Sequence, residues 1–438
     1  MGAKRLIVIG AGPKALALAA KAETLKRIDG ISNIPDIYIV DKTGVAANWT
    51  GQSGFTNGEH ALATSPMKDV GFPYHSECWT FANRAIDSAM LGFSWQSYLV
   101  ETSQLNSDFA DWLDRGAQPP SLAEWAEYLK WVKRKAGTFV HPGTATRMDI
   151  VNGKWMLEFN GGEPISADGL VITGPGPAKQ PTIIGDHRDR VTNAENFWNN
   201  IYRIESDSRV TVGVIGDGGA AASIVLTLLR MMPEKKCYIK IISETGVVYS
   251  RGESYDEKRH YSNPKGWQHF SPENREKFID HTLRGVFSVE AKSRINSATN
   301  IETTQGHVES IDAKEEQIKV RFTGGHVEQF DHVIVAIGFD GLWWKKKLGP
   351  NAQTLIGQRI DEALRPEGED PNREINEKCV RRRMGRYLDI RNVRPRLHLP
   401  MLADEMQGPG FSNLGCLGLL SDRILRSYCT LDGRRVDL

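Results

Sequence analysis

The sequence has few of the features that mark secreted, metal-binding, membrane or nucleic-acid-binding proteins. Its 438 residues include only five cysteines, which are scattered and form no CxxC pair. No apolar run approaches the roughly 20 residues that a membrane-spanning helix needs. The formal net charge of +1 gives no electrostatic reason to expect nucleic acid or an anionic membrane as partner. These absences predict a reduced, cytoplasmic protein without a structural metal, a disulfide framework, a nucleic-acid partner or a membrane span.

The length and composition are those of an ordinary globular protein with more than one domain. Hydrophobic residues make up 40% of the chain and charged residues 25%. At roughly 100 to 200 residues per domain, this length predicts two or three domains. The basic clusters Lys345–Lys347 and Arg381–Arg383 are short, and short charge runs are more often solvated surface than binding sites.

What the chain does contain is two glycine-rich turns, each after a short apolar run that predicts a buried parallel strand. Glycine lets the backbone turn tightly and approach a pyrophosphate, and a small third residue lets the next helix direct its positive end at the phosphates. Two such turns predict two bound dinucleotides. The predicted contacts are Gly10, Gly12, Pro13 and Ala15 at the first site, and Gly216, Gly218, Gly219 and Ala221 at the second.

The pattern between the turns predicts alternating strands and helices. Asp41 ends the second predicted strand, where an acidic side chain can accept hydrogen bonds from the ribose hydroxyls of an adenosine. The alternative is a polar cap on a strand. Residues 46–80 are rich in glycine and proline and predict an ordered loop of the kind that lines sites. The predicted strands are Leu6–Ile9, Ile37–Val40 and Tyr238–Ile242, and the predicted helices are 14–28, Trp95–Thr102 and Leu122–Arg134.

Two further apolar strands, within 167–175 and 330–339, each end in a glycine turn, and the second glycine signature lies between them. The simplest topology places a second nucleotide-binding domain inside the first. The predicted fold class is therefore α/β, with two Rossmann-like dinucleotide-binding domains, one inserted into the other, and a small helical substrate-binding region. The predicted boundaries are 1–185, 186–330 and 331–438.

Three further stretches narrow the function. They are Gly44–Trp49, Thr64–Tyr74, and the tail Gln407–Leu414 with Cys416–Arg423. They resemble segments of the flavin-dependent amine N-hydroxylases of microbial siderophore biosynthesis, particularly the mycobactin and nocobactin lysine N6-monooxygenases. The resemblance covers nearly the whole chain. It implies that 1–185 binds FAD, that 186–330 binds NADPH, and that 331–438 returns to the FAD domain and the substrate region.

The resemblance also implies a reaction. NADPH reduces FAD, oxygen adds to the reduced flavin to give a C4a-hydroperoxide, and the terminal amine of the substrate attacks the distal oxygen. The product is a hydroxylamine for a hydroxamate siderophore. Because the cofactor carries the chemistry, no catalytic side chain is predicted. An amine with a pKa of about 10.4 is protonated at neutral pH, and desolvation near the flavin would lower that pKa.

The same resemblance assigns site residues. Lys68 matches the lysine that holds the amino-acid carboxylate, and the alternative is a surface lysine paired with Asp69. Ser421 matches a serine near substrate and flavin, and the alternative is a helix N-cap. Lys258 is the third substrate-site candidate. The remaining FAD candidates are Asp41, Lys42, Trp49, Gly338 and Leu420.

The cation expected at the NADPH 2′-phosphate is Arg251, which follows the strand Tyr238–Ile242. The alternative is a surface arginine. The asparagines that hold ornithine in related enzymes are not clearly present, because 257–264 aligns ambiguously and Leu283 takes one of their positions.

Several functions stay open beside L-lysine hydroxylation. The missing asparagines favour a diamine such as putrescine or cadaverine, whereas Lys68 would repel a second ammonium group and favours an amino acid, lysine or ornithine. Baeyer–Villiger oxidation and a nucleotide-sensing role are further alternatives. A disulfide reductase would need a redox-active cysteine pair, which the chain lacks. The expected partners are a small amine substrate and dioxygen, and we expect a homo-oligomer.

Overall fold

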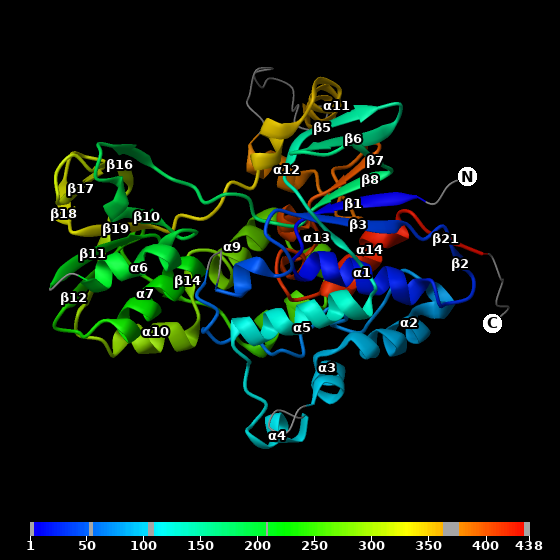
Figure 1. The fold of residues 1–438 in the computed structure, drawn as a ribbon, viewed down its shortest axis with the longest axis horizontal. Coiled ribbons are helices and arrows are strands. Elements are labelled where there is room, and N and C mark those ends of the chain that lie inside the picture. The colour runs from blue at the N-terminus through cyan, green and yellow to red at the C-terminus, as the bar shows by residue number, and fades with distance from the viewer. Residues whose placement is uncertain (1–3, 52–55, 104–108, 207–208, 362–375, 433–438) are drawn as a thin grey trace.

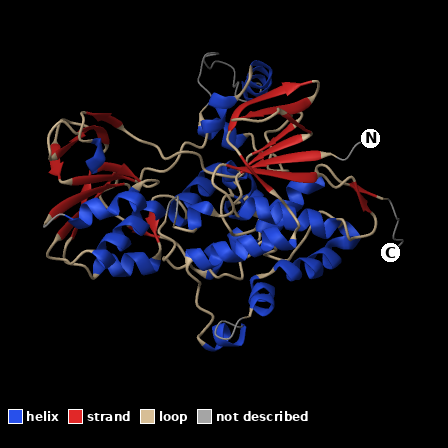
Figure 2. Ribbon diagram, viewed as in Figure 1, coloured by secondary structure: helices blue, strands red, loops and turns tan. Residues whose placement is uncertain are grey.

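The computed structural model describes residues 4–51, 56–103, 109–206, 209–361 and 376–432. Two sheet-containing regions flank a helical middle (Figures 1 and 2). The predicted α/β class is confirmed. Most predicted elements are also present, with ends that differ by one to three residues.

The first five-stranded sheet is wholly parallel, in the order β20-β8-β1-β3-β4. Its three central strands, β8, β1 and β3, are mostly apolar, as expected for strands covered on both faces. Helix α1 (Pro13–Leu25) follows β1 and packs against α14 (Leu417–Arg426), α5 (Leu122–Lys135) and α2 (Asn83–Met90). The strands are β1 (Arg5–Ile9), β3 (Asp36–Asp41), β4 (Val140–Pro142), β8 (Gly169–Ile172) and β20 (Arg396–His398).

The second five-stranded sheet, at the left in Figure 1, is also parallel, in the order β10-β19-β11-β12-β15. Because β19 pairs with β10 and β11, this sheet extends past residue 330, where the sequence placed its end. The strands are β10 (Val191–Asn193), β11 (Val210–Ile215), β12 (Cys237–Ser243), β15 (Ile301–Gln305) and β19 (His332–Val335), with helices α6 (Phe197–Ser206), α7 (Gly219–Met231) and α10 (Val289–Asn296) beside them.

Smaller sheets and peripheral helices complete the architecture. An antiparallel sheet holds β5 (Ala145–Val151), β6 (Lys154–Phe159) and β7 (Ile165–Ala167), and a mixed one holds β9 (Thr182–Ile184), β16 (Val308–Asp312), β17 (Ile318–Phe322) and β18 (Val327–Phe330). Two-stranded pairs join β2 (Ile31–Ser32) to β21 (Thr430–Leu431) and β13 (Tyr249–Ser250) to β14 (Val286–Phe287). The remaining helices are α3 (Trp95–Thr102), α4 (Phe109–Asp114), α8 (Tyr255–Ser262), α9 (Pro272–Thr282), α11 (Pro350–Asp361), α12 (Glu377–Arg382) and α13 (Asp404–Gln407).

The stretch that carries α8 and α9 lies against the C-terminal segment, in the middle of Figure 1, although the sequence placed it in the second domain. The indole Nε1 of Trp267 donates to the carbonyl of Glu405 at 2.9 Å. The side-chain amide of Gln268 donates to the carbonyl of Met406 at 2.9 Å. Residues 255–282 therefore pack with the region that follows residue 400.

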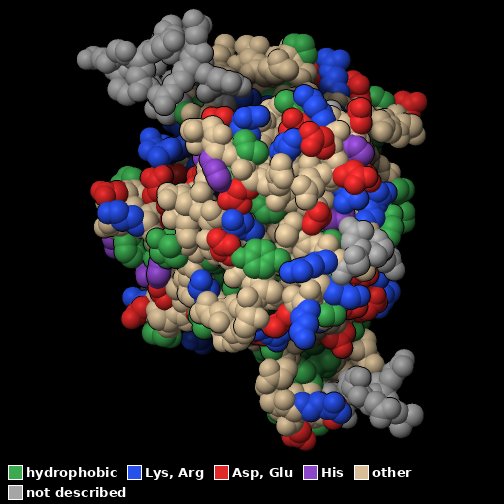
Figure 3. Space-filling model, turned by 90° about the vertical axis from the view of Figure 1, so that its left-hand side faces the viewer, with side chains coloured by type: hydrophobic (Ala, Val, Ile, Leu, Met, Phe, Trp, Pro, Cys, Tyr) green, Lys and Arg blue, Asp and Glu red, His purple; other side chains and the backbone are tan. Residues whose placement is uncertain are grey.

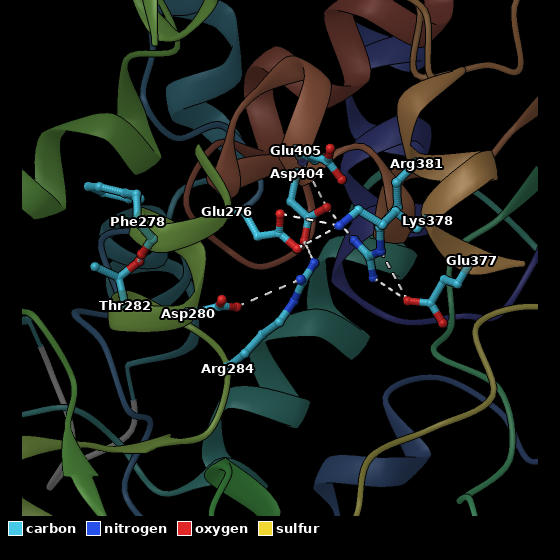
Figure 4. A network of polar contacts seen from close by, with 10 residues as sticks. All are labelled: Glu276, Phe278, Asp280, Thr282, Arg284, Glu377, Lys378, Arg381, Asp404 and Glu405. Carbon is cyan, nitrogen blue, oxygen red and sulfur yellow. Dashed lines mark hydrogen bonds and ion pairs between the residues drawn. The ribbon is translucent and has the colours of Figure 1, made fainter. Parts of the chain in front are cut away.

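A buried ion-pair network fastens this contact (Figure 4). Asp404 is only 2% exposed and lies between Arg284, at 3.1 Å, and Arg381. Because Arg381 lies on α12 and Asp404 on α13, their ion pair links these two helices, and Arg381 also pairs with Glu377 within α12 at 2.6 Å. The expectation that the Arg381–Arg383 cluster is solvated surface is therefore wrong for Arg381, because a distant buried carboxylate recruits it.

The face of the molecule drawn in Figure 3 has no large area of one charge sign. On the face in Figure 3, acidic and basic side chains are interspersed. Within the described ranges, no helix has both the length and the apolar character to cross a membrane. Nor do three or more potential metal-ligating side chains converge anywhere in that part of the chain.

Candidate functional site

The first glycine turn has the backbone of a phosphate cradle. Gly10 has φ +100°, and a Cβ there would lie 2.5 Å from the Oγ1 of Thr173. Gly12 is the N-cap of α1, has no side chain to cap it, and faces open space where a Cβ would be. Pro13 occupies the first helical turn, and Ala15 is fully buried beneath it. A phosphate could therefore approach the positive end of α1 without a steric barrier.

Asp41 holds the neighbouring loop against this turn. One carboxylate oxygen accepts from the backbone N–H of Ala11 at 2.9 Å, and the other accepts from those of Thr43 and Gly44, both at 2.8 Å. The Thr43 hydroxyl also donates to that second oxygen, at 3.0 Å. The oxygen that accepts from Ala11 therefore keeps its second lone pair for a ribose hydroxyl. Two further candidates lie close by: Lys42 is exposed, 4.0 Å from Glu195, and Trp49 is half-buried in a short 3-10 turn.

The second glycine turn repeats the geometry at the end of β11. Gly216 has φ +123°, and a Cβ there would lie 2.3 Å from the carbonyl oxygen of Ala336. Gly218 caps α7, and both Gly218 and Gly219 face open space. Ala221 is fully buried under the turn. The carboxylate of Asp217 accepts from the Oγ of Ser243 on β12 at 2.6 Å.

Gly338 lies just beyond β19, which is a strand of the second sheet rather than the first. It has φ +86° and faces open space, and its carbonyl accepts from the backbone N–H of Lys179 at 2.9 Å. Lys179 and Gly338 lie on the two chain segments that cross between the sheets. If Gly338 contacts FAD, as the sequence predicts, it does so from a segment that connects the two sheets and not from the end of a strand of the first sheet.

Two cations share one carboxylate, and Lys68 lies within the influence of their charges, where the 46–80 loop meets the segment after β13. Arg251 pairs with Glu253 at 2.9 Å, and Lys258 lies 3.8 Å from the same carboxylate. The guanidinium of Arg251 also donates to the carbonyl of Ala63 at 3.4 Å, which brings it to the loop that carries Lys68. Burial, and then the charges of Lys258 and Arg251, lower the pKa of Lys68. We call Lys68, Arg251, Lys258 and Glu253 the cationic cluster.

Lys68 has no ion-pair partner among the described residues, and its ammonium lies 5.8 Å from the centre of the Phe72 ring. The alternative of a surface pair with Asp69 is wrong. Asp69 is fully buried, accepts from the Tyr74 hydroxyl at 2.7 Å and from the N–H of Trp95 at 3.0 Å, and burial raises its pKa to about 6. Asp69 therefore fixes the loop and does not pair with Lys68.

Ser421 lies in the middle of α14 and is fully buried. Its hydroxyl contacts the carbonyls of Leu417 and Gly418 at 3.1 and 2.9 Å, as serines inside helices commonly do. The N-cap of α14 is Cys416, so the N-cap alternative for Ser421 is wrong. Leu420, the neighbouring FAD candidate, is also fully buried.

Sequence reasoning missed Gly418, which joins α14 to the Lys68 loop. Its backbone N–H donates to the carbonyl of Phe72 at 2.7 Å, and a Cβ there would lie 2.3 Å from the carbonyl oxygen of Gly71. Only a glycine allows this close approach. Gly418 lies inside the tail segment Cys416–Arg423, but the sequence of that segment does not show that it packs against Gly71.

Two more contacts fasten the same loop to the second sheet. His60 hydrogen-bonds the hydroxyl of Thr227 on α7 at 2.8 Å, and Arg230 pairs with Glu59 at 2.6 Å. Burial, and then the charge of Arg230, lower the pKa of His60. The loop 56–74 thus contacts α7, Arg251 and α14, and lies at the centre of the candidate site.

The chain is similar to a known group of flavin enzymes. Residues 87–295 match the family model described as L-lysine 6-monooxygenase/L-ornithine 5-monooxygenase. The L-lysine N6-monooxygenase MbtG of Mycobacterium sp. (strain MCS) is 38% identical over 427 residues, 96% of this chain and 94% of that protein. MbtG of Mycobacterium tuberculosis (strain ATCC 25618 / H37Rv) is 34% identical over the same shares.

Solved structures agree. Lysine monooxygenase NbtG from Nocardia farcinica matches with a TM-score of 0.80 and 33% identity, over 96% of this chain and 98% of that one. The ornithine N-hydroxylase KtzI of Kutzneria sp. 744, solved with reduced FAD, NADP+ and L-ornithine, matches with a TM-score of 0.71 over 98% and 99% of the two chains. KtzI is 16% identical, so it shows a shared fold only.

Proposed function

Because the chain belongs to the family of L-lysine 6-monooxygenases and L-ornithine 5-monooxygenases, we propose that it hydroxylates the terminal amine of L-lysine with FAD and NADPH. The product is a hydroxylamine for siderophore biosynthesis. The two MbtG proteins, which this chain matches over almost their full length, are named as lysine enzymes, which supports lysine. The cationic cluster is the single observation in this chain that carries the choice of an amino acid over a diamine.

The glycine turns fit the two cofactors. FAD would lie at Gly10 and Gly12 with Asp41 toward its ribose, and NADPH would lie at Gly216 and Gly218. Each turn combines a positive-φ glycine with an open helix N-terminus, which suits a pyrophosphate. When bound and reduced, the flavin supplies the activated oxygen, and the protein contributes binding, orientation and exclusion of water.

The cationic cluster has three positive charges and one negative charge. Glu253 is already shared between Arg251 and Lys258, so the ammonium of Lys68 is the one left to bind an incoming carboxylate. A charge-assisted hydrogen bond of this kind contributes about 2 kcal/mol, or roughly 30-fold in affinity. A diamine would bring a second ammonium to the same place and would be repelled.

Holding the carboxylate at the cluster directs the other end of the substrate into the interior. That end must lose its proton before its lone pair can react. Removing an amine from water lowers its pKa, so burial of the substrate favours the neutral form. No general base is assigned to this step.

The test compares lysine with cadaverine, which has the same terminal amine and chain length but lacks the carboxylate. Purified protein with FAD and NADPH is given each amine, with ornithine and putrescine alongside, and hydroxylated product is measured by mass. We expect kcat/KM for lysine to exceed that for cadaverine by about 30-fold or more. Hydroxylation of none of the four amines would overturn the proposal, and a preference for cadaverine would overturn the role of the cationic cluster.

A further inference from the structure

Helix α1 carries two buried lysines about two turns apart, Lys14 and Lys21, which are 8% and 1% exposed. Lys21 has a normal partner for a buried cation. Its ammonium lies 2.8 Å from the fully buried carboxylate of Asp422 on α14, and it also donates to the Oγ of Ser76 at 3.1 Å.

Lys14 has no such partner. Its ammonium donates to the carbonyl oxygen of Ser412 at 3.0 Å and to the sulfur of Met401 at 3.2 Å, and both acceptors are uncharged. Within the described part of the chain, no carboxylate oxygen lies within 4.0 Å of it. A buried cation without a counter-ion is rare, because proteins pair such charges or suppress them.

The surroundings offer nothing that neutralises this charge. The titratable group that influences the pKa of Lys14 is the thiol of Cys416, at the start of α14. Burial raises the pKa of that thiol to about 12, so the thiol is neutral at pH 7 and supplies no negative charge. Burial lowers the pKa of Lys14 to about 8, so the amine is still mostly protonated at pH 7. Lys14 also lies in the first turn of α1, where the helix dipole is positive.

The position of Lys14 indicates where the missing anion belongs. The residue directly follows Gly12 and Pro13 of the first glycine turn, and its side chain runs to Met401 and Ser412, just before α14. The charge therefore lies between the turn that fits a pyrophosphate and the segment that leads to Ser421. A ligand that carries negative charge into this space would complete the site.

We propose that Lys14 is the counter-ion for an anionic group of the bound flavin dinucleotide. That group is either the pyrophosphate or the ring that becomes anionic on reduction. The inference rests on the proposed FAD site. It assigns to Lys14 a role in binding the cofactor and in setting the reduction potential of the flavin, although the glycine-turn motif does not fix the residue type at this position. Lys21, which is paired within the protein, has no such role.

The central test is Lys14→Met, which keeps a long unbranched side chain and removes the charge. We expect the thermal midpoint of the cofactor-free protein to rise, because the unpaired charge is gone. If the pyrophosphate is the partner, we expect the affinity for oxidised FAD, measured by flavin fluorescence, to fall about tenfold or more. Lys14→Arg keeps the charge and should lose less affinity. The matched control is Lys21→Met with Asp422→Asn, which removes the paired charges and should leave FAD affinity within about threefold.

Two further measurements distinguish the sources of the anion. If the pyrophosphate is the partner, ADP affinity falls by the same factor as FAD affinity, and the reduction potential of bound flavin is unchanged. If the reduced ring is the partner, ADP affinity is unchanged and the potential becomes more negative, by about 30 mV for a tenfold loss of reduced-flavin affinity. Both results support the inference.

Unchanged FAD affinity, ADP affinity and potential in Lys14→Met would overturn it. This outcome is separable from failure of the proposed function. If the unaltered protein binds FAD but hydroxylates no amine, the proposed function fails while the Lys14 measurements still decide the inference.

Discussion

The stability of the cofactor-free protein should rise with pH because of Lys14. Burial lowers the pKa of this amine to about 8, whereas a lysine in the unfolded chain titrates at about 10.4. Between these two values the unfolded chain binds more protons than the folded one, so the free energy of unfolding increases with pH. The two pKa values give a gain of about 1 kcal/mol between pH 7 and pH 9, and about 3 kcal/mol over the whole range.

The assay is urea unfolding of the cofactor-free protein at pH 7 and pH 9, with Lys14→Met as reference. Other buried groups also titrate, and burial raises the pKa of the Cys429 thiol to about 12, but their contributions are common to both proteins and cancel in the difference. FAD-bound protein should lose the gain, because the counter-ion restores the charged amine. If the unaltered protein gains no more stability than Lys14→Met, then Lys14 is not an unpaired buried cation.

Three substitutions test the remaining parts of the site. Lys68→Met should raise KM for lysine by about 10- to 100-fold but not KM for cadaverine, with NADPH-driven flavin reduction intact; an unchanged lysine KM would refute the carboxylate role. Gly216 has φ +123°, and Gly216→Val would place a Cβ 2.3 Å from the carbonyl oxygen of Ala336. The variant should therefore lose NADPH-driven flavin reduction while FAD stays bound. Loss of FAD with NADPH use preserved would reverse the assignment of the two turns. Asp404→Asn removes the buried negative charge between Arg284 and Arg381 but leaves Arg381 paired with Glu377, so it should lower the free energy of unfolding by about 2 kcal/mol. An unchanged urea midpoint would contradict this prediction.

The elements that sequence reasoning predicted well depend on local pattern. The apolar runs before Gly10 and Gly216 predict strands because parallel strands are buried on both faces, and both are present. One difference in strand pairing concerns 332–335. Its pattern resembles that of β8, yet it pairs in the second sheet, because an apolar strand followed by a glycine turn does not specify which neighbour it joins.

The parts of the site that were missed depend on partners distant in sequence. Asp69 was weighed as a surface partner of Lys68, but Tyr74 and Trp95 hold it inside. Arg251 was assigned to a phosphate from its place after β12, and the structure brings it to Ala63 and Glu253. Whether Arg251 also contacts NADPH stays a prediction, as do the other cofactor contacts.

The two lysines of α1 show most clearly what residue type and spacing leave open. Their separation of about two turns puts them on one face of the helix, and both are buried. The opposing helix α14 carries a single acidic residue, Asp422, and Lys21 occupies it. Lys14 therefore remains a buried cation without a carboxylate partner, at a position where a leucine would have no electrostatic cost. Retaining a charge there is unfavourable until an anion arrives, so the fold itself makes cofactor binding more favourable than the glycine turn alone would.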